Sequence, residues 1–240
     1  MVNGLEIFRQ YFRDNGNDYI LIGGVACDLV LNSINREFRP TLDFDIVIVS
    51  ENLQSGFGQR LKEFIRDGGY IVQSRKSTNR PTFFRFVNPQ NGDFPSQLEL
   101  ASNKPADNWV SHFAPLDIGD AKSSLSAILF EPEYYNFIRN NTVTISDITT
   151  ISLEGLVPLK ALAFIELSKI DAPTEKNLIA MKKHADDILM LAEILSTETF
   201  VLPPAVAMGL RTAISAISQR DLTDDQRERL DLIRQFYRLA

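Results

Sequence analysis

Residues 39–49 read Arg-Pro-Thr-Leu-Asp-Phe-Asp-Ile-Val-Ile-Val, with two aspartates at the start of an apolar run. Side chains alternate between the faces of a β-strand, so Asp43 and Asp45 share one face and the apolar neighbours take the other. Two carboxylates this close repel each other at pH 7 unless one keeps its proton or a divalent cation neutralises them. Oxygen ligands favour Mg²⁺ or Mn²⁺. The stretch therefore predicts a strand with a metal site, although an isolated Asp-x-Asp pair also occurs among solvated turn residues.

About twenty residues upstream, another apolar run ends in a pair of glycines. Tyr19-Ile-Leu-Ile22 is typical of a strand, Gly23 and Gly24 indicate a tight turn, and apolar residues recur at helical spacing from 25 to 30. Residues without side chains let a phosphate approach backbone N–H groups at a helix N-terminus. Any tight strand-to-helix turn also favours glycine. The combination is what indicates a phosphate site facing a pair of metal-binding carboxylates.

The pattern of the chain changes near its middle. Short β-rich runs alternate with helical patterns up to about residue 126, and mostly helical patterns follow from residue 133. Thr223 and Gln226 have the spacing of a capping box at the start of the last helix. We expect an α/β domain over 1–130 and a mainly helical domain over 131–240, with the division between residues 128 and 152. The predicted strands are 19–22, 44–49, 70–73, 82–87, 97–101 and 142–145, and the predicted helices after residue 50 are 57–67, 133–139, 153–167, 175–195, 204–218 and 223–239.

Composition narrows the class of protein. The 240 residues are 44% hydrophobic and 23% charged, which is ordinary for a globular chain and excludes collagen, coiled coil and long disorder. One cysteine, Cys27, and two histidines exclude an internal disulfide and a Cys/His zinc cluster. The net charge of −6 requires any nucleic-acid contact to come from a local basic patch.

Targeting signals are not apparent in the sequence. The first 16 residues mix charged and apolar side chains, unlike an export signal. No apolar run approaches the roughly 20 residues that a membrane-spanning helix needs. We therefore expect a soluble, cytoplasmic protein without a membrane partner.

Taken together, the motifs resemble the signature of the DNA-polymerase-β-like nucleotidyltransferase superfamily. The matching residues are Gly23-Gly24-x-Ala26 and Arg39-x-Thr41-x-Asp43-x-Asp45 entering an apolar strand. Further along, Leu156-Val-Pro-Leu-Lys-Ala-Leu-Ala163 and Lys182-Lys-His-Ala-Asp-Asp-Ile-Leu-Met-Leu191 are similar to the C-terminal signature of its AbiEii-type branch, known from abortive-infection toxins of bacterial toxin–antitoxin pairs. The resemblance implies an α+β fold, in which a mixed sheet flanked by helices precedes a C-terminal helical bundle lobe.

The same resemblance implies a set of site residues. A third acidic residue on a later strand completes the family's site, and we assign it to Glu99, because alternation in Gln97-Leu-Glu-Leu100 sends Glu99 away from its leucine neighbours. The family more commonly has Asp there, so Glu99 also reads as an exposed residue of an edge strand, and Asp93 and Asp117 are weaker competitors. The implied nucleotide-binding residues are Gly23, Gly24, Arg39, Thr41 and Lys183; the implied catalytic residues are Asp43, Asp45, Glu99, Lys160 and Asp187, of which Asp43, Asp45 and Glu99 hold the metal.

The helical half contributes two of these catalytic residues. Lys160 lies on an apolar helix, where an unpaired lysine is costly to bury, so it either contacts the triphosphate, as the resemblance implies, or extends to solvent. Asp187 closes the site from the helical lobe in similar proteins. Lys182 and Asp186, four residues apart, are expected to form an ordinary surface ion pair.

The sequence thus predicts a Mg²⁺-dependent, or Mn²⁺-dependent, nucleotidyltransferase that moves a nucleoside monophosphate from an NTP to an acceptor hydroxyl. The toxin-like motif favours an RNA or protein acceptor and an antitoxin partner, and a basic cluster around residues 75–85 is a candidate RNA contact. Two alternatives remain open. One is a non-catalytic nucleotide- or partner-binding domain of the same fold, and the other is a transferase acting on a small, aminoglycoside-like acceptor.

Overall fold

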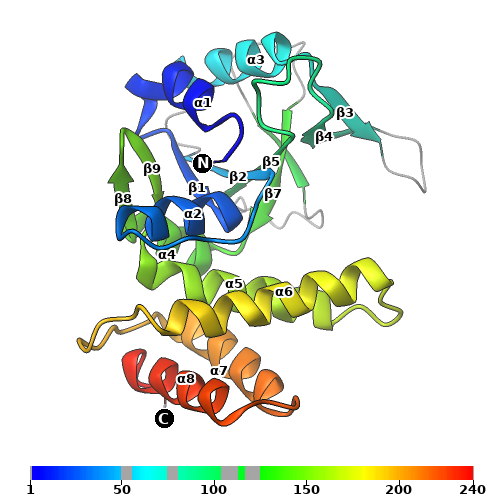
Figure 1. Ribbon diagram of the computed structural model, residues 1–240. Helices are drawn as coiled ribbons and strands as arrows, with labels where there is room; N and C mark the ends of the chain where they lie inside the picture. Colours follow the sequence, from blue (N-terminus) through cyan, green and yellow to red (C-terminus); the bar gives the residue numbers. More distant parts are fainter. Residues whose placement is uncertain (1, 50–55, 75–80, 104–112, 117–124, 240) are drawn as a thin grey trace. The chain divides into compact units, whose positions relative to one another are not determined.

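The computed structural model describes residues 2–49, 56–74, 81–103, 113–116 and 125–239 (Figure 1). The chain forms two compact units, Met1–Ile151 and Ser152–Ala240. This boundary lies within the expected interval of 128–152 and 21 residues after residue 130, the expected end of the first domain; the segment between ends in strand β9 (Ile148–Ile151), which pairs with strand β1 (Tyr19–Ile22). The expected α+β class is confirmed, with a mixed sheet and its helices in the first unit and helices alone in the described part of the second.

A mixed sheet of nine described strands forms the centre of the first unit. Its order is β3-β4-β5-β2-β1-β9-β8, and β7 pairs with both β5 and β6. Strand β2 runs antiparallel to β1 and parallel to β5, so the strand with the two aspartates lies inside the sheet. The remaining strands are β2 (Asp43–Ile48), β3 (Ile71–Ser74), β4 (Pro81–Val87), β5 (Gln97–Asn103), β6 (Phe113–Leu116), β7 (Leu125–Phe130) and β8 (Thr142–Ile145).

An aromatic core covers one face of this sheet. Phe8 lies at its centre, with ring centroids 4.6 Å from Phe12, 5.1 Å from Tyr19 and 5.5 Å from Phe44. Helices α1 and α3, which lie over this face in Figure 1, contribute much of the cluster. Because Phe44 points into the core, alternation turns its neighbours Asp43 and Asp45 to the opposite face. The helices of this unit are α1 (Leu5–Phe12), α2 (Gly23–Ser33), α3 (Phe57–Asp67) and α4 (Pro132–Asn140), and a short 3₁₀ turn, Arg13–Asn15, follows α1.

Four helices, α5 (Leu153–Ser168), α6 (Glu175–Ala192), α7 (Pro204–Ser218) and α8 (Asp224–Phe236), make up the described second unit. All four were predicted, and each ends within three residues of its predicted bounds. Thr223 and Gln226 form the predicted capping box, with reciprocal hydrogen bonds between each side chain and the other residue's backbone N–H. Within the described residues, no helix has the length and apolar character needed to cross a bilayer.

Helix α5 contains a proline whose effect on the backbone is compensated from elsewhere in the unit. Pro158 lacks an N–H group, so the carbonyl of Glu154, four residues earlier, loses its helical partner. The hydroxyl of Tyr237 donates to this carbonyl at 2.8 Å. Burial raises the pKa of Tyr237 well above its ordinary value, with a smaller contribution from Glu154, so the hydroxyl keeps its proton. A side chain 83 residues away therefore satisfies the carbonyl that Pro158 leaves open.

Candidate functional site

The two aspartates of β2 stand in a row with a third carboxylate. In the sheet register, Asp45 is paired with Ile22 of β1 on one side and with Glu99 of β5 on the other. Asp43 lies one pleat earlier, opposite Gln97. Asp43 is exposed and Asp45 is half-buried, whereas the phenylalanine between them is fully buried. The structure therefore places three predicted carboxylates on one face of two neighbouring parallel strands.

The glycine turn lies directly against this row. Gly23 has φ +71°, in the left-handed region, and a Cβ on it would lie 2.0 Å from Oδ2 of Asp45. A Cβ on Gly24 would lie 2.2 Å from the hydroxyl oxygen of Thr41. Both glycines are thus required by close approach, because a side chain at either position would occupy the space of a site residue. The structure brings together four predicted residues: Gly23, Gly24, Thr41 and Asp45.

Helix α2 begins at this same place. Its N-cap is Ile22, which has no polar side chain, so no side-chain cap serves the first N–H groups of the helix. The partial positive charge of a helix N-terminus attracts anions, phosphate included. A phosphate bound here would lie next to the carboxylates of β2. The turn therefore offers backbone donors on one side and oxygen ligands on the other.

Glu99 is held by two neighbours. Its Oε1 forms an ion pair with Nη2 of Arg85 at 2.7 Å and accepts a hydrogen bond from Nε2 of Gln97 at 2.6 Å. Strand β5 lies between β2 and β4, so the alternative interpretation of Glu99 as a residue of an edge strand is wrong. Sequence reasoning missed both partners, since the link between Arg85 and Glu99 depends on the register of two strands 14 residues apart.

The donor set suits a small, hard cation. No group of three or more His, Cys, Asp and Glu side chains in the described part of the chain is arranged to hold a metal. Mg²⁺ does not require one, because it is usually bound by one or two carboxylates together with water and substrate phosphates. Asp43 and Asp45 supply two carboxylates beside an approachable backbone, which fits this ligand pattern. Glu99 as a third ligand stays a prediction.

Other predicted residues of the first unit make contacts of their own. The guanidinium of Arg39 lies over the ring of Phe38, with its central carbon 4.9 Å from the ring centroid. Asp93 is exposed in a loop, where its N–H donates to the side chain of Asn91. Asp117 lies outside the described residues, as does the basic loop segment 75–80.

The helical unit pairs two predicted residues with each other. Nζ of Lys160 on α5 lies 2.7 Å from Oδ2 of Asp187 on α6, and the two side chains are only 5% and 4% exposed. The alternative that Lys160 extends to solvent is therefore wrong. Lys183 is exposed. Lys182 and Asp186 form the predicted surface pair at 2.6 Å, with side chains 65% and 48% exposed.

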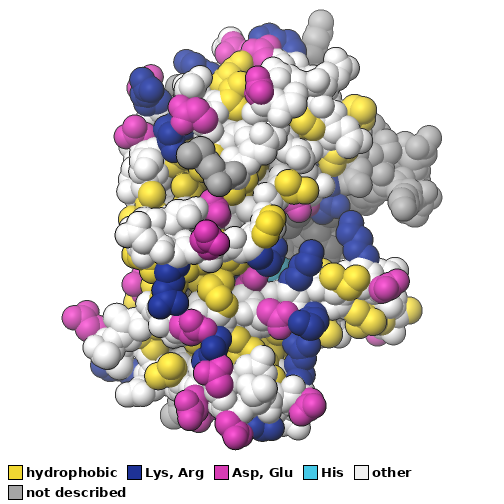
Figure 2. Space-filling model, in the orientation of Figure 1, with side chains coloured by type: hydrophobic (Ala, Val, Ile, Leu, Met, Phe, Trp, Pro, Cys, Tyr) yellow, Lys and Arg dark blue, Asp and Glu magenta, His cyan; other side chains and the backbone are white. Residues whose placement is uncertain are grey.

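Charge on the surface of helix α8 is balanced locally. Figure 2 shows acidic and basic side chains intermixed over α8. Arg229 pairs with Asp225 and with Glu193, and Arg234 pairs with Asp231 at 2.6 Å. This helix therefore presents a solvated mixed surface instead of the basic patch that a nucleic-acid backbone would need.

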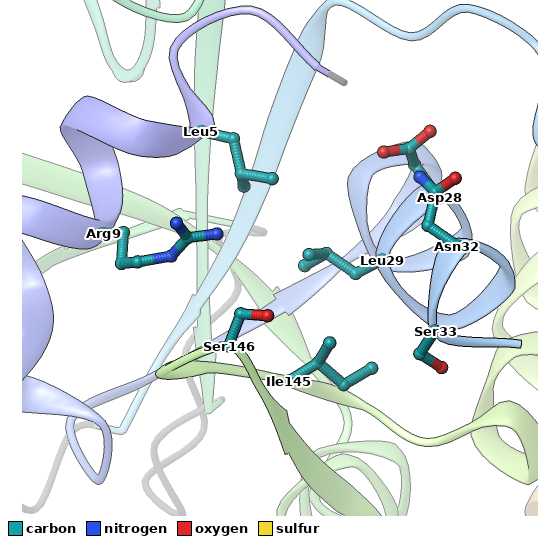
Figure 3. A pocket seen from close by; sticks show the side chains of 8 residues that line it. All are labelled: Leu5, Arg9, Asp28, Leu29, Asn32, Ser33, Ile145 and Ser146. Carbon is teal, nitrogen blue, oxygen red and sulfur yellow. The ribbon is translucent and has the colours of Figure 1, made fainter. Parts of the chain in front are cut away.

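A separate cavity of about 380 Å³ lies in the first unit among α1, α2 and the turn between β8 and β9 (Figure 3). Arg9 points into it between Leu5 and Ser146, and Asp28 lies on the opposite wall. The guanidinium of Arg9 is already paired with Glu6. None of the predicted site residues lines this cavity, so it is distinct from the carboxylate row.

Comparison with known proteins gives two structural likenesses. No family model matches the sequence, and no curated protein matches it. The chain is similar to a crystal structure of the lincosamide antibiotic adenylyltransferase LnuA with lincomycin bound, at 16% identity and a TM-score of 0.36, over 78% of this chain and 99% of that one. It is also similar to a solution structure of the antibiotic-resistance factor ANT(2'')-Ia, at 14% identity and a TM-score of 0.36, over 88% and 96% of the two chains. TM-scores this low decide neither substrate nor activity, so the candidate site rests on its own residues.

Proposed function

We propose that this protein is a Mg²⁺-dependent nucleotidyltransferase. The observation that carries the proposal is the contact between the Gly23 turn and Asp45, which sets a carboxylate against the uncapped N-terminus of α2. A nucleoside triphosphate needs such a combination, because its phosphates require backbone donors and its cation requires oxygen ligands. Asp43 and Glu99, on the same face, add negative charge where a cation would bind.

Each residue of the row has a defined task in this reaction. The N–H groups that follow Gly23 and the hydroxyl of Thr41 hold the phosphates, and Asp43 and Asp45 hold Mg²⁺. The bound cation neutralises charge on the phosphates. Glu99 orients the acceptor hydroxyl and takes up its proton as the new O–P bond forms on the α-phosphorus. The bond from that phosphorus to the β-phosphate oxygen breaks, and pyrophosphate leaves. Positioning and electrostatic stabilisation supply most of the catalysis in such a transfer.

The helical motifs extend the proposal to the acceptor. By their resemblance to the AbiEii-type branch, Lys160 neutralises phosphate charge with support from Asp187, Lys183 takes part in nucleotide binding, and the acceptor is RNA or protein. In this proposal the chain acts as the toxin of a toxin–antitoxin pair and binds an antitoxin protein. Lys160 and Asp187 form an ion pair, so each of these two motif residues stabilises the other.

Transfer of label from each α-³²P-labelled NTP tests the activity. Purified protein is incubated with Mg²⁺ and, in separate reactions, total RNA, a protein extract, an aminoglycoside and a lincosamide. We expect label in the RNA or protein fraction, a loss of about 10³-fold or more in the Asp43→Asn/Asp45→Asn variant, and no label when the metal is chelated. Asp93→Asn, an exposed loop carboxylate of the same unit, is the matched control and keeps wild-type transfer.

Each outcome separates the proposal from its alternatives. Undiminished transfer by the double Asn variant would mean that the carboxylates of β2 take no part in the reaction. Label on an antibiotic alone would overturn the RNA or protein acceptor and favour a small-molecule transferase. Calorimetric binding of Mg²⁺-NTP without transfer to any acceptor would favour a non-catalytic binding domain.

A further inference from the structure

Glu99 is anchored through one of its two carboxylate oxygens. Oε1 is ion-paired with Nη2 of Arg85 and accepts a hydrogen bond from Nε2 of Gln97. Among the described residues, no hydrogen bond engages Oε2. The ion pair and the hydrogen bond to Oε1 together restrict rotation of the carboxylate. Glu99 therefore offers one restrained oxygen on the face that carries Asp43 and Asp45.

Arg85 lies in the same register row of the sheet as the proposed metal site. Arg85 is paired in register with Glu99, and Glu99 is paired in register with Asp45. Neighbouring strands lie about 4.8 Å apart, so the backbones of Arg85 and Asp45 are separated by about 10 Å. This distance is close to the Debye length at physiological salt, roughly 8 Å, and both side chains of the pair are partly buried, which weakens screening.

We propose that Arg85 is a positioning residue that sets the charge balance of the metal site through Glu99. This inference rests on the proposed function. Without Arg85, Glu99 keeps its negative charge beside Asp45 with no cation paired to it among the described residues. With it, Glu99 is neutralised on one side and held in one orientation, so that Asp43 and Asp45 dominate cation binding. Gln97 contributes to the orientation but not to the charge.

The proposal predicts opposite effects on cation affinity for the two members of the pair. Arg85→Gln removes a positive charge and is expected to tighten Mn²⁺ binding by about 3-fold to 10-fold, whereas Glu99→Gln weakens it by a similar factor. The double variant Arg85→Gln/Glu99→Gln removes both charges and returns the Mn²⁺ dissociation constant to within about twofold of wild type. Arg85→Lys keeps the charge and stays within the same limit.

We expect kcat to depend on the orientation of Glu99 and not on the affinity for Mn²⁺. Arg85→Gln lowers kcat by about 10-fold to 100-fold and leaves the KM for the NTP within about twofold, because Glu99 loses its fixed direction while the phosphate contacts remain. Arg85→Lys recovers only part of kcat, since an ammonium lacks the planar geometry of a guanidinium. If Arg85 had a purely structural role, Arg85→Gln would lower thermal stability but would not combine tighter Mn²⁺ binding with a lower kcat.

Mn²⁺ titration by electron paramagnetic resonance, with and without a non-hydrolysable NTP analogue, tests the proposal without requiring a known acceptor. Arg66→Gln, an exposed arginine of the same unit paired only with its neighbour Asp67, is the matched control and leaves Mn²⁺ affinity unchanged. Unchanged affinity in Arg85→Gln, or a double variant as weak as Glu99→Gln, would overturn the role of Arg85.

A failure of the proposed function gives a different result. If Mn²⁺ binds equally well to wild type and to Asp43→Asn/Asp45→Asn, or binds to neither, the metal site itself is wrong. If binding depends on these aspartates but not on Arg85, only the further inference fails. The two results therefore remain distinguishable in one set of titrations.

Discussion

Two ion pairs with the same contact distance occupy very different surroundings. Arg85 and Glu99 meet at 2.7 Å on neighbouring strands of the sheet, with side chains 35% and 18% exposed. Lys160 and Asp187 also meet at 2.7 Å, between two packed helices and nearly shielded from water. The first pair is partly accessible to solvent, whereas the second is almost completely buried. Burial, and not distance, therefore decides what a charged pair contributes.

Breaking the buried pair gives the largest expected loss of stability. Asp187→Ala leaves the Lys160 ammonium buried without its carboxylate and is expected to cost about 3–5 kcal/mol in the free energy of unfolding. Replacing both residues, as Lys160→Met/Asp187→Leu, removes both charges and recovers most of this loss. Chemical denaturation of the three proteins measures the difference.

The same double variant also tests the catalytic assignment of Lys160. A protein that regains stability but shows no nucleotidyl transfer would support a role for Lys160 in the reaction. Wild-type transfer by the double variant would reduce this pair to a structural one. A double variant as unstable as Asp187→Ala would contradict the expectation that burial dominates the cost.

A neutral buried contact in the same unit has an intermediate effect. Tyr237→Phe removes the hydroxyl that donates to the Glu154 carbonyl, which Pro158 leaves without a helical partner. A fully buried carbonyl without a partner costs about 1–3 kcal/mol, and this one is partly buried, so we expect a cost of about 1 kcal/mol and thermal unfolding at a lower temperature. Combining Tyr237→Phe with Pro158→Ala restores a backbone donor for that carbonyl. If Tyr237→Phe costs the same in both backgrounds, the proposed compensation is absent.

Breaking the exposed ion pair between Lys182 and Asp186 on α6 has the smallest expected effect on stability. It is the matched comparison for Asp187. Asp186 directly precedes Asp187 and pairs with Lys182 four residues earlier, but both side chains of this pair are largely exposed. Lys182→Ala is expected to change the free energy of unfolding by less than about 0.5 kcal/mol. Denaturation in low and high salt measures this value, and a loss approaching that of Asp187→Ala would contradict the role given to burial.

Local patterns in the sequence were sufficient for much of the fold and part of the site. Alternation in β2 placed Asp43 and Asp45 on one face, and the glycine pair marked the turn between β1 and α2. Helical periodicity found the four helices of the second unit. Helix α1 was missed although Leu5, Phe8 and Phe12 recur at helical spacing, because charged residues interrupt the short apolar pattern. The short strand β9 was missed as well, since four residues carry little periodicity and its pairing with β1 is distant in sequence.

The sequence by itself determined the residue types of the site, the face that the two aspartates share, and the succession of an α/β part and a helical part. These features depend on neighbours within a few positions, where backbone geometry sets the period. Only the tertiary structure decided the division after Ile151, the contact of Gly23 with Asp45, and the partners of Glu99, Lys160 and Glu154. Those partners lie 14, 27 and 83 residues away along the chain. Strand register and helix packing bring them together, and neither is encoded in the local period of a single sequence.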